Sequence, residues 1–196
     1  MKAVVVMAML LSTPAVQAGD FAPRVINMQF SGGQNPLNRH GRSVFRTVHF
    51  EVTGNSKTLS RWIPNTDTGI AVSYSKVRQA RSWFGYTYGD PNDHVRAETA
   101  FVFMRHQWRT FASAKPYFEI GTGPMWANRR VPAATSRFNF SSQAGFGLTI
   151  NPDSNRPWMI GYRFSHISNG GTAERNPGLN VHSMMIGVRA WTLKRQ

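Results

Sequence analysis

His166 and Ser168 are the residues whose types and spacing could perform covalent chemistry in this chain. An imidazole nitrogen can accept the seryl proton as the hydroxyl attacks an acyl carbon, which is the base–nucleophile contact of acyl transfer. Residues two apart on a β-strand point to the same face. The pair therefore predicts an esterase-type site if its segment is a strand, although a His-x-Ser match alone is most often structural.

Potential hydrogen-bond donors follow this pair directly. Asn169, Gly170 and Gly171 come next in the sequence, and Asn176 lies a few residues later. Glycine lets a backbone N–H approach a reacting oxygen closely, and an amide side chain can donate to the same oxygen. We therefore predict that these four residues stabilise an oxyanion. The alternative is that Asn-Gly-Gly and Asn-Pro-Gly only form a loop.

The segment 138–150 has the clearest strand pattern of the chain. Phe138, Phe146 and Leu148 share one face, whereas glycine, amide and hydroxyl side chains occupy the other. A soluble barrel would hold its large apolar residues inside, so this pattern favours a narrow polar lumen with apolar residues facing lipid. Weaker alternation with period two occurs around residues 26–30, 44–52, 70–74, 98–108, 118–123, 158–164 and 182–190.

These segments give about eight strands, and eight is the smallest even number that closes a bacterial outer-membrane barrel. They therefore predict an all-β fold, an eight-stranded antiparallel transmembrane β-barrel of the bacterial outer membrane. Tryptophans at 62, 108, 126, 158 and 191 lie near the proposed strand ends, as in interfacial belts, with core tryptophan as the alternative. Long connections are expected at 76–96 and 169–179, a compact turn at 151–155 and a short helix around Ser56–Trp62.

The strand that carries the candidate pair places it on the predicted lipid-facing side. Trp158, Ile160 and Tyr162 share the parity of His166 and Ser168. The pair would continue an apolar stripe at the outer end of an outgoing strand, which indicates a lipid substrate. A soluble lipocalin-like carrier is disfavoured by the same outward apolar parity.

The N-terminus and the overall charge fit an exported membrane protein. Lys2, the apolar run 3–11 and the small-residue end at Ala18 predict a signal peptide over 1–18, leaving a barrel domain over 19–196. The run is too short for an anchor helix. A formal charge of +14 favours an anionic membrane surface rather than nucleic acid, unless the charges are merely scattered over loops and lumen. Absence of cysteine excludes a disulfide scaffold.

The stretch around the candidate pair resembles the lipid A 3-O-deacylase (PagL) family. The resemblance covers roughly the last 80 residues well, and the first half only in strand pattern. It implies an eight-stranded barrel, a Ser-His-Glu triad, and removal of the ester-linked 3-hydroxyacyl chain of lipid A in the Gram-negative outer membrane, without a metal or other cofactor. The implied partner is lipopolysaccharide, and a homodimer is left open. The residues that carry the resemblance are the segments 115–121, 138–150, 162–171 and 176–180.

In that comparison Ser168 is the nucleophile and His166 the general base, and the triad glutamate falls on Asn180. An asparagine can orient the histidine by a hydrogen bond but supplies no charge to an imidazolium. Glu174 could take its place from the loop. The alternative function is a non-catalytic small barrel, structural or adhesive, that has lost the triad acid.

Overall fold

The computed structural model describes residues 20–35, 43–79, 82–83, 86–87, 94–133 and 135–193, so the predicted signal peptide at 1–18 lies outside the described residues. Eight long antiparallel strands close into a barrel in the order β1-β10-β9-β8-β7-β6-β3-β2, which confirms the predicted fold class. The strands are β1 (Phe21–Gln34), β2 (Val44–Ser56), β3 (Thr66–Arg78), β6 (His94–Gln107), β7 (Ala114–Ala127), β8 (Phe138–Ile150), β9 (Trp158–Ser168) and β10 (Leu179–Thr192).

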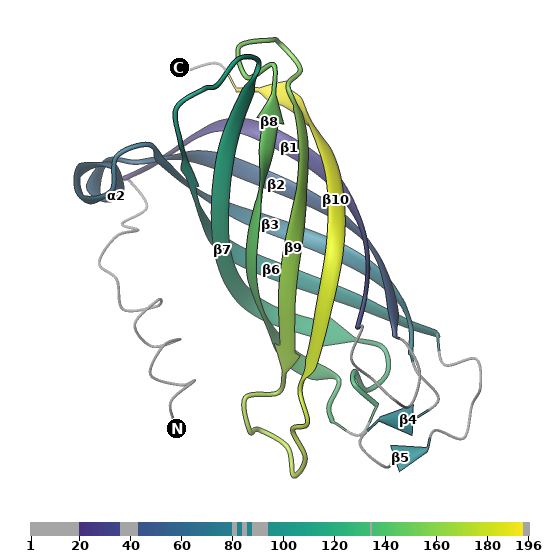
Figure 1. The fold of residues 1–196 in the computed structure, drawn as a ribbon. Helices are drawn as coiled ribbons and strands as arrows, with labels where there is room; N and C mark the ends of the chain where they lie inside the picture. The colour runs from purple at the N-terminus through teal and green to yellow at the C-terminus, as the bar shows by residue number, and fades with distance from the viewer. Residues whose placement is uncertain are drawn as a thin grey trace.

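The connections divide between the two ends of the barrel (Figure 1). One end, which we call the loop end, carries the segment 169–178 and the small sheet formed by β4 (Ser82–Trp83) and β5 (Tyr86–Thr87). The other end carries α2 (Lys57–Trp62), the turn after β8 and the last described residues, and we call it the α2 end. In the described part of the chain, no helix is long and apolar enough to cross a membrane.

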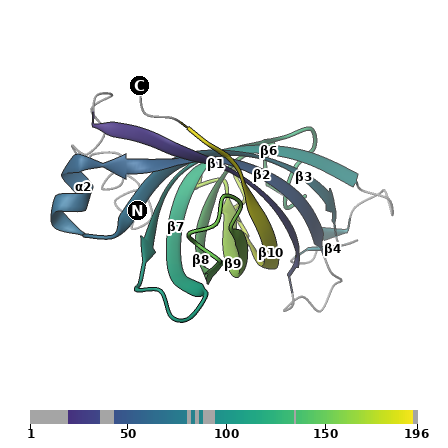
Figure 2. The ribbon, with the colours of Figure 1, turned by 90° about the horizontal axis from the view of Figure 1, so that it is seen from above.

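The predicted short helix between β2 and β3 is confirmed as α2, which projects from the barrel wall in both views (Figures 1 and 2). Its N-cap is Ser56, whose hydroxyl accepts a hydrogen bond from the Leu59 N–H at 3.0 Å. The same hydroxyl donates to Asp20, and this hydrogen bond lowers the pKa of the Asp20 carboxyl from its ordinary value. The cap thereby ties the start of the helix to the segment that leads into β1.

Side chains alternate between an apolar outer face and a polar lumen, as the sequence predicted. Large exposed apolar residues point outward from most strands, for example Phe50 on β2, Val102 on β6 and Phe146 on β8. Buried polar residues such as Asn27 and Ser141 point inward. The five tryptophans at 62, 108, 126, 158 and 191 are 50–79% exposed near the ends of the barrel elements, so they are not core residues. Such a surface is typical of a barrel embedded in lipid, with aromatic belts at both interfaces.

The middle of the lumen holds a cluster of two carboxylates and two guanidinium groups. Glu119 lies between Arg105 and Arg163, and each arginine donates two hydrogen bonds to one of its carboxylate oxygens, over 2.6–3.0 Å. Glu51 accepts from Arg105 at 2.9 Å and lies 3.5 Å from Arg163. The charges of these four side chains cancel, which is the condition under which buried ions are tolerated.

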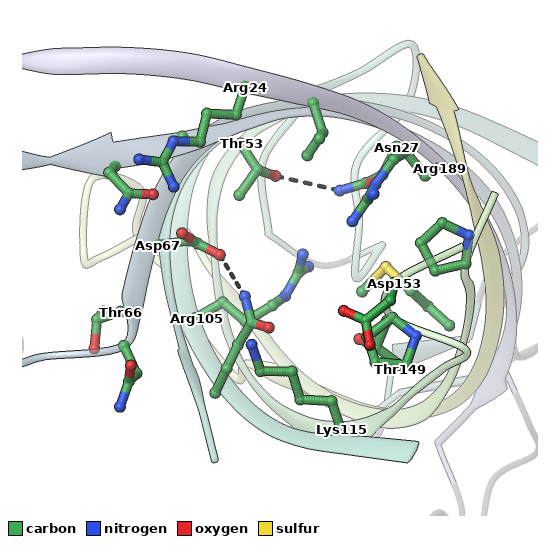
Figure 3. Close-up of a pocket in the computed structure, with 18 residues that line it drawn as sticks. Arg24, Asn27, Thr53, Thr66, Asp67, Arg105, Lys115, Thr149, Asp153 and Arg189 are labelled. Atoms are coloured by element: carbon green, nitrogen blue, oxygen red, sulfur yellow. Dashed lines mark hydrogen bonds between the residues drawn. The ribbon is translucent and has the colours of Figure 1, made fainter. Parts of the chain in front are cut away.

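The lumen differs on the two sides of this cluster. Toward the loop end it is filled by a buried apolar layer, which includes Val77, Ile167 and Val181. Toward the α2 end it widens into a cavity of about 350 Å³, into which Arg24, Lys115 and other polar side chains project (Figure 3). The barrel therefore has a large polar cavity at its α2 end, whereas the cavities described at its centre and toward its loop end are only about 20 and 40 Å³.

The charge cluster generates a stability prediction. Glu119→Ala leaves Arg105 and Arg163 facing each other without the carboxylate that separates them, and we expect a loss of about 3–5 kcal/mol in the free energy of unfolding. Urea unfolding in detergent micelles, followed by tryptophan fluorescence, measures this loss. Glu98→Ala removes an exposed carboxylate from β6 and is the matched control. Equal small losses in both variants would contradict the assigned role of Glu119.

Candidate active site

Strand β9 presents His166 and Ser168 on the outer face of the barrel. Arg163 points into the lumen charge cluster and Ile167 into the apolar layer, so His166, just before Ile167, and Ser168, just after it, point outward. The His166 side chain is exposed and Ser168 is half-buried. Both lie at the loop end of β9, on the same face as the exposed Trp158 and Ile160.

Asn180 on β10 is the cross-strand partner of His166, and their side chains are hydrogen-bonded. His166 Nδ1 lies 2.7 Å from Asn180 Oδ1. An amide oxygen can only accept, so Nδ1 is the donor in this contact and carries the ring proton. The partner of one ring nitrogen fixes the state of the other. The lone pair of Nε2 is therefore available to take a proton, although the amide supplies no negative charge.

Gly178 packs against the Cε1–Nε2 edge of the His166 ring. It lies in the segment that returns from β9 to β10 and has a φ of +65°, a backbone conformation that glycine adopts readily. A Cβ built at this position would lie 2.9 Å from His166 Cε1 and 3.5 Å from Nε2. The imidazole is thus held between Asn180 and a glycine backbone, and a larger residue at 178 would displace it.

Ser168 follows His166 on the same outward face, and the two side chains form no hydrogen bond in the described structure. Its cross-strand partner on β8 is Phe140, a half-buried aromatic residue. Catalytic hydrogen bonds are often long in a free enzyme and shorten when substrate binds. The structure brings the nucleophile and base candidates to one face without joining them.

The loop after Ser168 is organised by Asn169, whose side chain is fully buried. Its amide group donates to the Arg175 carbonyl at 2.7 Å and its amide oxygen accepts from the Gly171 N–H at 2.9 Å. Its backbone N–H donates to Asn176 Oδ1 at 3.0 Å. Asn169, Gly171 and Asn176 therefore build the loop, as the loop-forming alternative expected. Gly170 and Gly171 both have positive φ, +65° and +83°.

Glu174, the other candidate for the third triad member, and His182 occupy different positions. Glu174 is exposed on the loop, and no described hydrogen bond or ion pair joins it to His166. Its role as the third triad member stays a prediction. His182 lies two residues beyond Asn180 on the outward face of β10, where it hydrogen-bonds the Tyr162 hydroxyl and packs edge-on against Phe164 with ring centroids 5.3 Å apart.

A groove of about 430 Å³ opens on the outer wall at His182, two residues along β10 from Asn180. Its walls include Tyr162, His182 and Met184 on one side and Arg46 on the other. Gly32 on β1 forms part of its floor, and a Cβ added there would meet no atom within 4 Å. The groove exists because β1 and β10 pair, so it joins residues from the two ends of the chain.

Sequence reasoning missed the contact of Gly178 with the imidazole and the groove over Gly32. The Asn176-Pro177-Gly178 string signalled a turn, but not the direction in which the loop would return. Gly32 and Gly33 signalled only close backbone approach in a strand.

Comparison with known proteins gives a family match. Residues 47–189 match the model of the family described as Lipid A 3-O-deacylase (PagL). The lipid A deacylase PagL of Bordetella bronchiseptica (strain ATCC BAA-588 / NCTC 13252 / RB50) is 36% identical over 94 residues, which cover 45% of this chain and 47% of that protein. The match thus spans about half the length of this curated relative.

Two solved structures share the fold. The crystal structure of the outer membrane enzyme PagL superposes with a TM-score of 0.58 at 15% identity, over 82% of this chain and 97% of that one. The crystal structure of Neisserial surface protein A (NspA) gives 0.60 at 12% identity, over 86% and 97%. At these identities the likeness establishes the small closed barrel.

The contact between His166 and Asn180 generates a prediction about the imidazole tautomer. Asn180→Leu keeps a similar volume but removes the acceptor, so Nδ1 should lose its preference for the proton. The ¹⁵N chemical shifts of the His166 ring nitrogens report this change when they are recorded in labelled protein with the imidazole neutral. Unchanged shifts in the variant would show that Asn180 does not set the tautomer. Asn155→Leu, at an exposed asparagine, is the control and should leave the His166 shifts unchanged. A buried asparagine such as Asn139 would not serve, because its replacement could disturb the barrel.

Proposed function

Because the chain belongs to the lipid A 3-O-deacylase (PagL) family, we propose that it hydrolyses the ester-linked 3-hydroxyacyl chain of lipid A, with Ser168 and His166 as the reacting pair. The observation that carries this proposal is the outward-facing His166, whose Nδ1 is engaged by Asn180 and whose Nε2 is left as a base on the face of Ser168.

The reaction proceeds as acyl transfer to serine followed by hydrolysis. Ser168 Oγ attacks the ester carbonyl carbon while His166 Nε2 takes the hydroxyl proton. The carbon–oxygen bond to the sugar then breaks, and His166 returns the proton to the departing sugar oxygen. A water molecule, deprotonated by His166, attacks the acyl-enzyme. This step releases the 3-hydroxy fatty acid and restores the Ser168 hydroxyl.

The donors that remain for the oxyanion are fewer than the sequence predicted. Asn169 and the Gly171 N–H are used within the loop. Within the part of the chain that the structure describes, the Gly170 N–H has no partner and Asn176 uses its oxygen alone, so the amide N–H₂ of Asn176 can still donate. We assign oxyanion stabilisation to Gly170 and Asn176, and the positioning of their loop to Asn169 and Gly171.

Asn180 orients the base in this proposal, and Glu174 stays the alternative third member. The hydrogen bond to Nδ1 supports the asparagine, since it selects the tautomer in which Nε2 is basic. A neutral amide does not stabilise the imidazolium formed during attack. The reaction is therefore expected to be slower than one with a carboxylate at this position.

The lipid substrate and the outer-membrane location are supported by the surface on which the site lies. An apolar outer wall with tryptophans near both ends fits the lipid–water geometry of a membrane barrel. The site lies at one end of this wall, where an ester between a sugar headgroup and an acyl chain would be found. The groove at His182 offers room for an acyl chain, and Arg46 in its wall can pair with a lipid phosphate.

The first experiment is mass spectrometry of lipid A from cells that express the chain. The intact protein should remove one 3-hydroxyacyl mass, and Ser168→Ala should leave lipid A unchanged because the nucleophile is gone. Heat-dependent migration of the barrel on gels confirms that the variant assembles. Ser165→Ala changes a serine on the inward face of the same strand and is the control that should keep activity.

Either contrary result has a defined meaning. Deacylation retained by Ser168→Ala would overturn the assigned nucleophile. Unchanged lipid A with the intact, assembled protein would favour a non-catalytic barrel, structural or adhesive, for which Asn180 in place of an acid is the supporting feature. Asn180→Glu then tests whether a carboxylate at this position restores the reaction.

The packing of Gly178 generates a second functional prediction. Gly178→Ala adds a Cβ 2.9 Å from His166 Cε1 and should rotate the base away from Ser168. We expect the deacylation rate to fall about 10- to 100-fold, because small misplacements of reacting groups have effects of that size. Gly171→Ala introduces similar backbone strain, but its Cβ would meet no atom within 4 Å, so its loss should be smaller. Equal losses of rate in the two variants would show that backbone strain alone, and not contact with His166, causes the effect.

A further inference from the structure

A continuous polar row crosses four neighbouring strands on the outer face of the barrel. Asn180 on β10 pairs with His166 on β9, His166 pairs with Ser142 on β8, and Ser142 pairs with Thr122 on β7. The next partner, Val102 on β6, is an exposed apolar residue. The row therefore extends beyond the proposed catalytic residues by two hydroxyl side chains and ends there.

Ser142 and Thr122 form a hydroxyl pair, with their oxygens 3.0 Å apart. Ser142 is exposed, whereas Thr122 is 8% exposed. One hydrogen bond between two hydroxyls uses one of their two protons, so one O–H and several lone pairs are left over. Two positions away along each strand, the outward residues are apolar: Phe140 and Ala144 on β8, and Ile120 and Pro124 on β7.

A polar pair within an apolar wall needs a partner if that wall faces lipid, because an unsatisfied hydroxyl is unfavourable in hydrocarbon. The lumen of the same barrel contains a comparable pair, Thr47 and Ser75, 2.9 Å apart. That pair is surrounded by other polar lumen groups and needs no ligand. The outward pair differs in facing away from the lumen, directly beside His166.

The distances favour a contact with the reacting lipid. Directly opposed side chains on antiparallel strands have Cβ atoms about 4.5–5.5 Å apart. Ser142 therefore flanks His166 on the side opposite Asn180. The row crosses the strands at the level of His166, two residues further from the loop end than Ser168 and its partner Phe140. A substrate whose ester lies at Ser168 would therefore bring the polar groups next to that ester within reach of the Ser142 hydroxyl.

We propose that Ser142 and Thr122 form a sugar-binding subsite, which holds a hydroxyl or amide group of the glucosamine and positions its ester at Ser168. This inference rests on the proposed deacylase function. Ser142 touches the substrate in this assignment, and Thr122 orients the Ser142 hydroxyl through their hydrogen bond. The subsite gives the enzyme a means of distinguishing a glycolipid ester from an ester that lacks the sugar.

The test compares two substrates with the full chain in detergent micelles: lipid A, and a p-nitrophenyl acyl ester that contains no sugar. Ser142→Ala should lower kcat/KM for lipid A about 3- to 10-fold, the usual effect of one lost hydrogen bond, mainly through KM. Hydrolysis of the p-nitrophenyl ester should stay within about twofold of the original rate. Thr122→Val, which removes the hydroxyl at constant shape, should give a weaker loss of the same kind, and Ser142→Thr should restore lipid A turnover.

Ser75→Ala, in the lumen pair, is the matched control and should affect neither substrate selectively. An equal loss on both substrates would overturn the subsite, because Ser142 would then belong to the reaction centre. Unchanged kinetics on both would overturn it as well. Ser168→Ala separates this inference from the proposed function: if that variant is inactive while Ser142→Ala is unaltered, only the subsite fails. Heat-dependent gel migration confirms that each variant assembles before its kinetics are compared.

Discussion

Glu119 accepts hydrogen bonds from Arg105 and Arg163 inside a closed sheet, and Glu51 completes the charge balance. These ions can be buried only if all four point into the lumen together. Side chains alternate with a period of two, so a slip of one residue in any of these strands would expose a charge on the outer wall and bury its apolar face. The charge cluster thus favours one register for the strands that contribute to it, and β9 is one of them.

The register of β9 also sets the direction of the candidate site residues, because they lie only a few positions from Arg163 in the sequence. Arg163 points inward, so His166, three residues later, points outward, and Ser168 follows on the same side. The loop that follows is held by hydrogen bonds of Asn169, and it returns the chain so that Gly178 and Asn180 contact the imidazole. One hairpin therefore carries all the residues of the proposed site: the nucleophile, the base, its orienting group and the oxyanion donors assigned to it. Strand β8 adds the neighbouring hydroxyl of Ser142 and the aromatic ring of Phe140 opposite Ser168.

The sequence predicted the features that depend on alternation within one strand. The segment 138–150, the outward direction of His166 and Ser168, and the helix after Ser56 all follow from local patterns. Alternation identifies the face of a residue but not its neighbour across the sheet. The charge cluster joins four strands, the groove at Gly32 needs the first and last strands to pair, and the Gly178 contact depends on the path of a loop. Such features arise when the strands pair and the sheet closes into a barrel, so the spacing of residues along the sequence could not predict them.

The apolar layer at the loop end has a consequence for the second reactant of any hydrolysis at this site. Ile167, Leu179 and Val181 fill the lumen directly behind His166 and Asn180, while the polar cavity lies beyond the charge cluster at the opposite end. Water that enters that cavity is separated from the reacting face by the packed interior and by the sheet itself. The water that cleaves an acyl-enzyme must therefore arrive along the outer surface, from the aqueous side of the loop 169–178. Hydration of the headgroup region around this loop, and not permeation through the barrel, would then supply the water for deacylation.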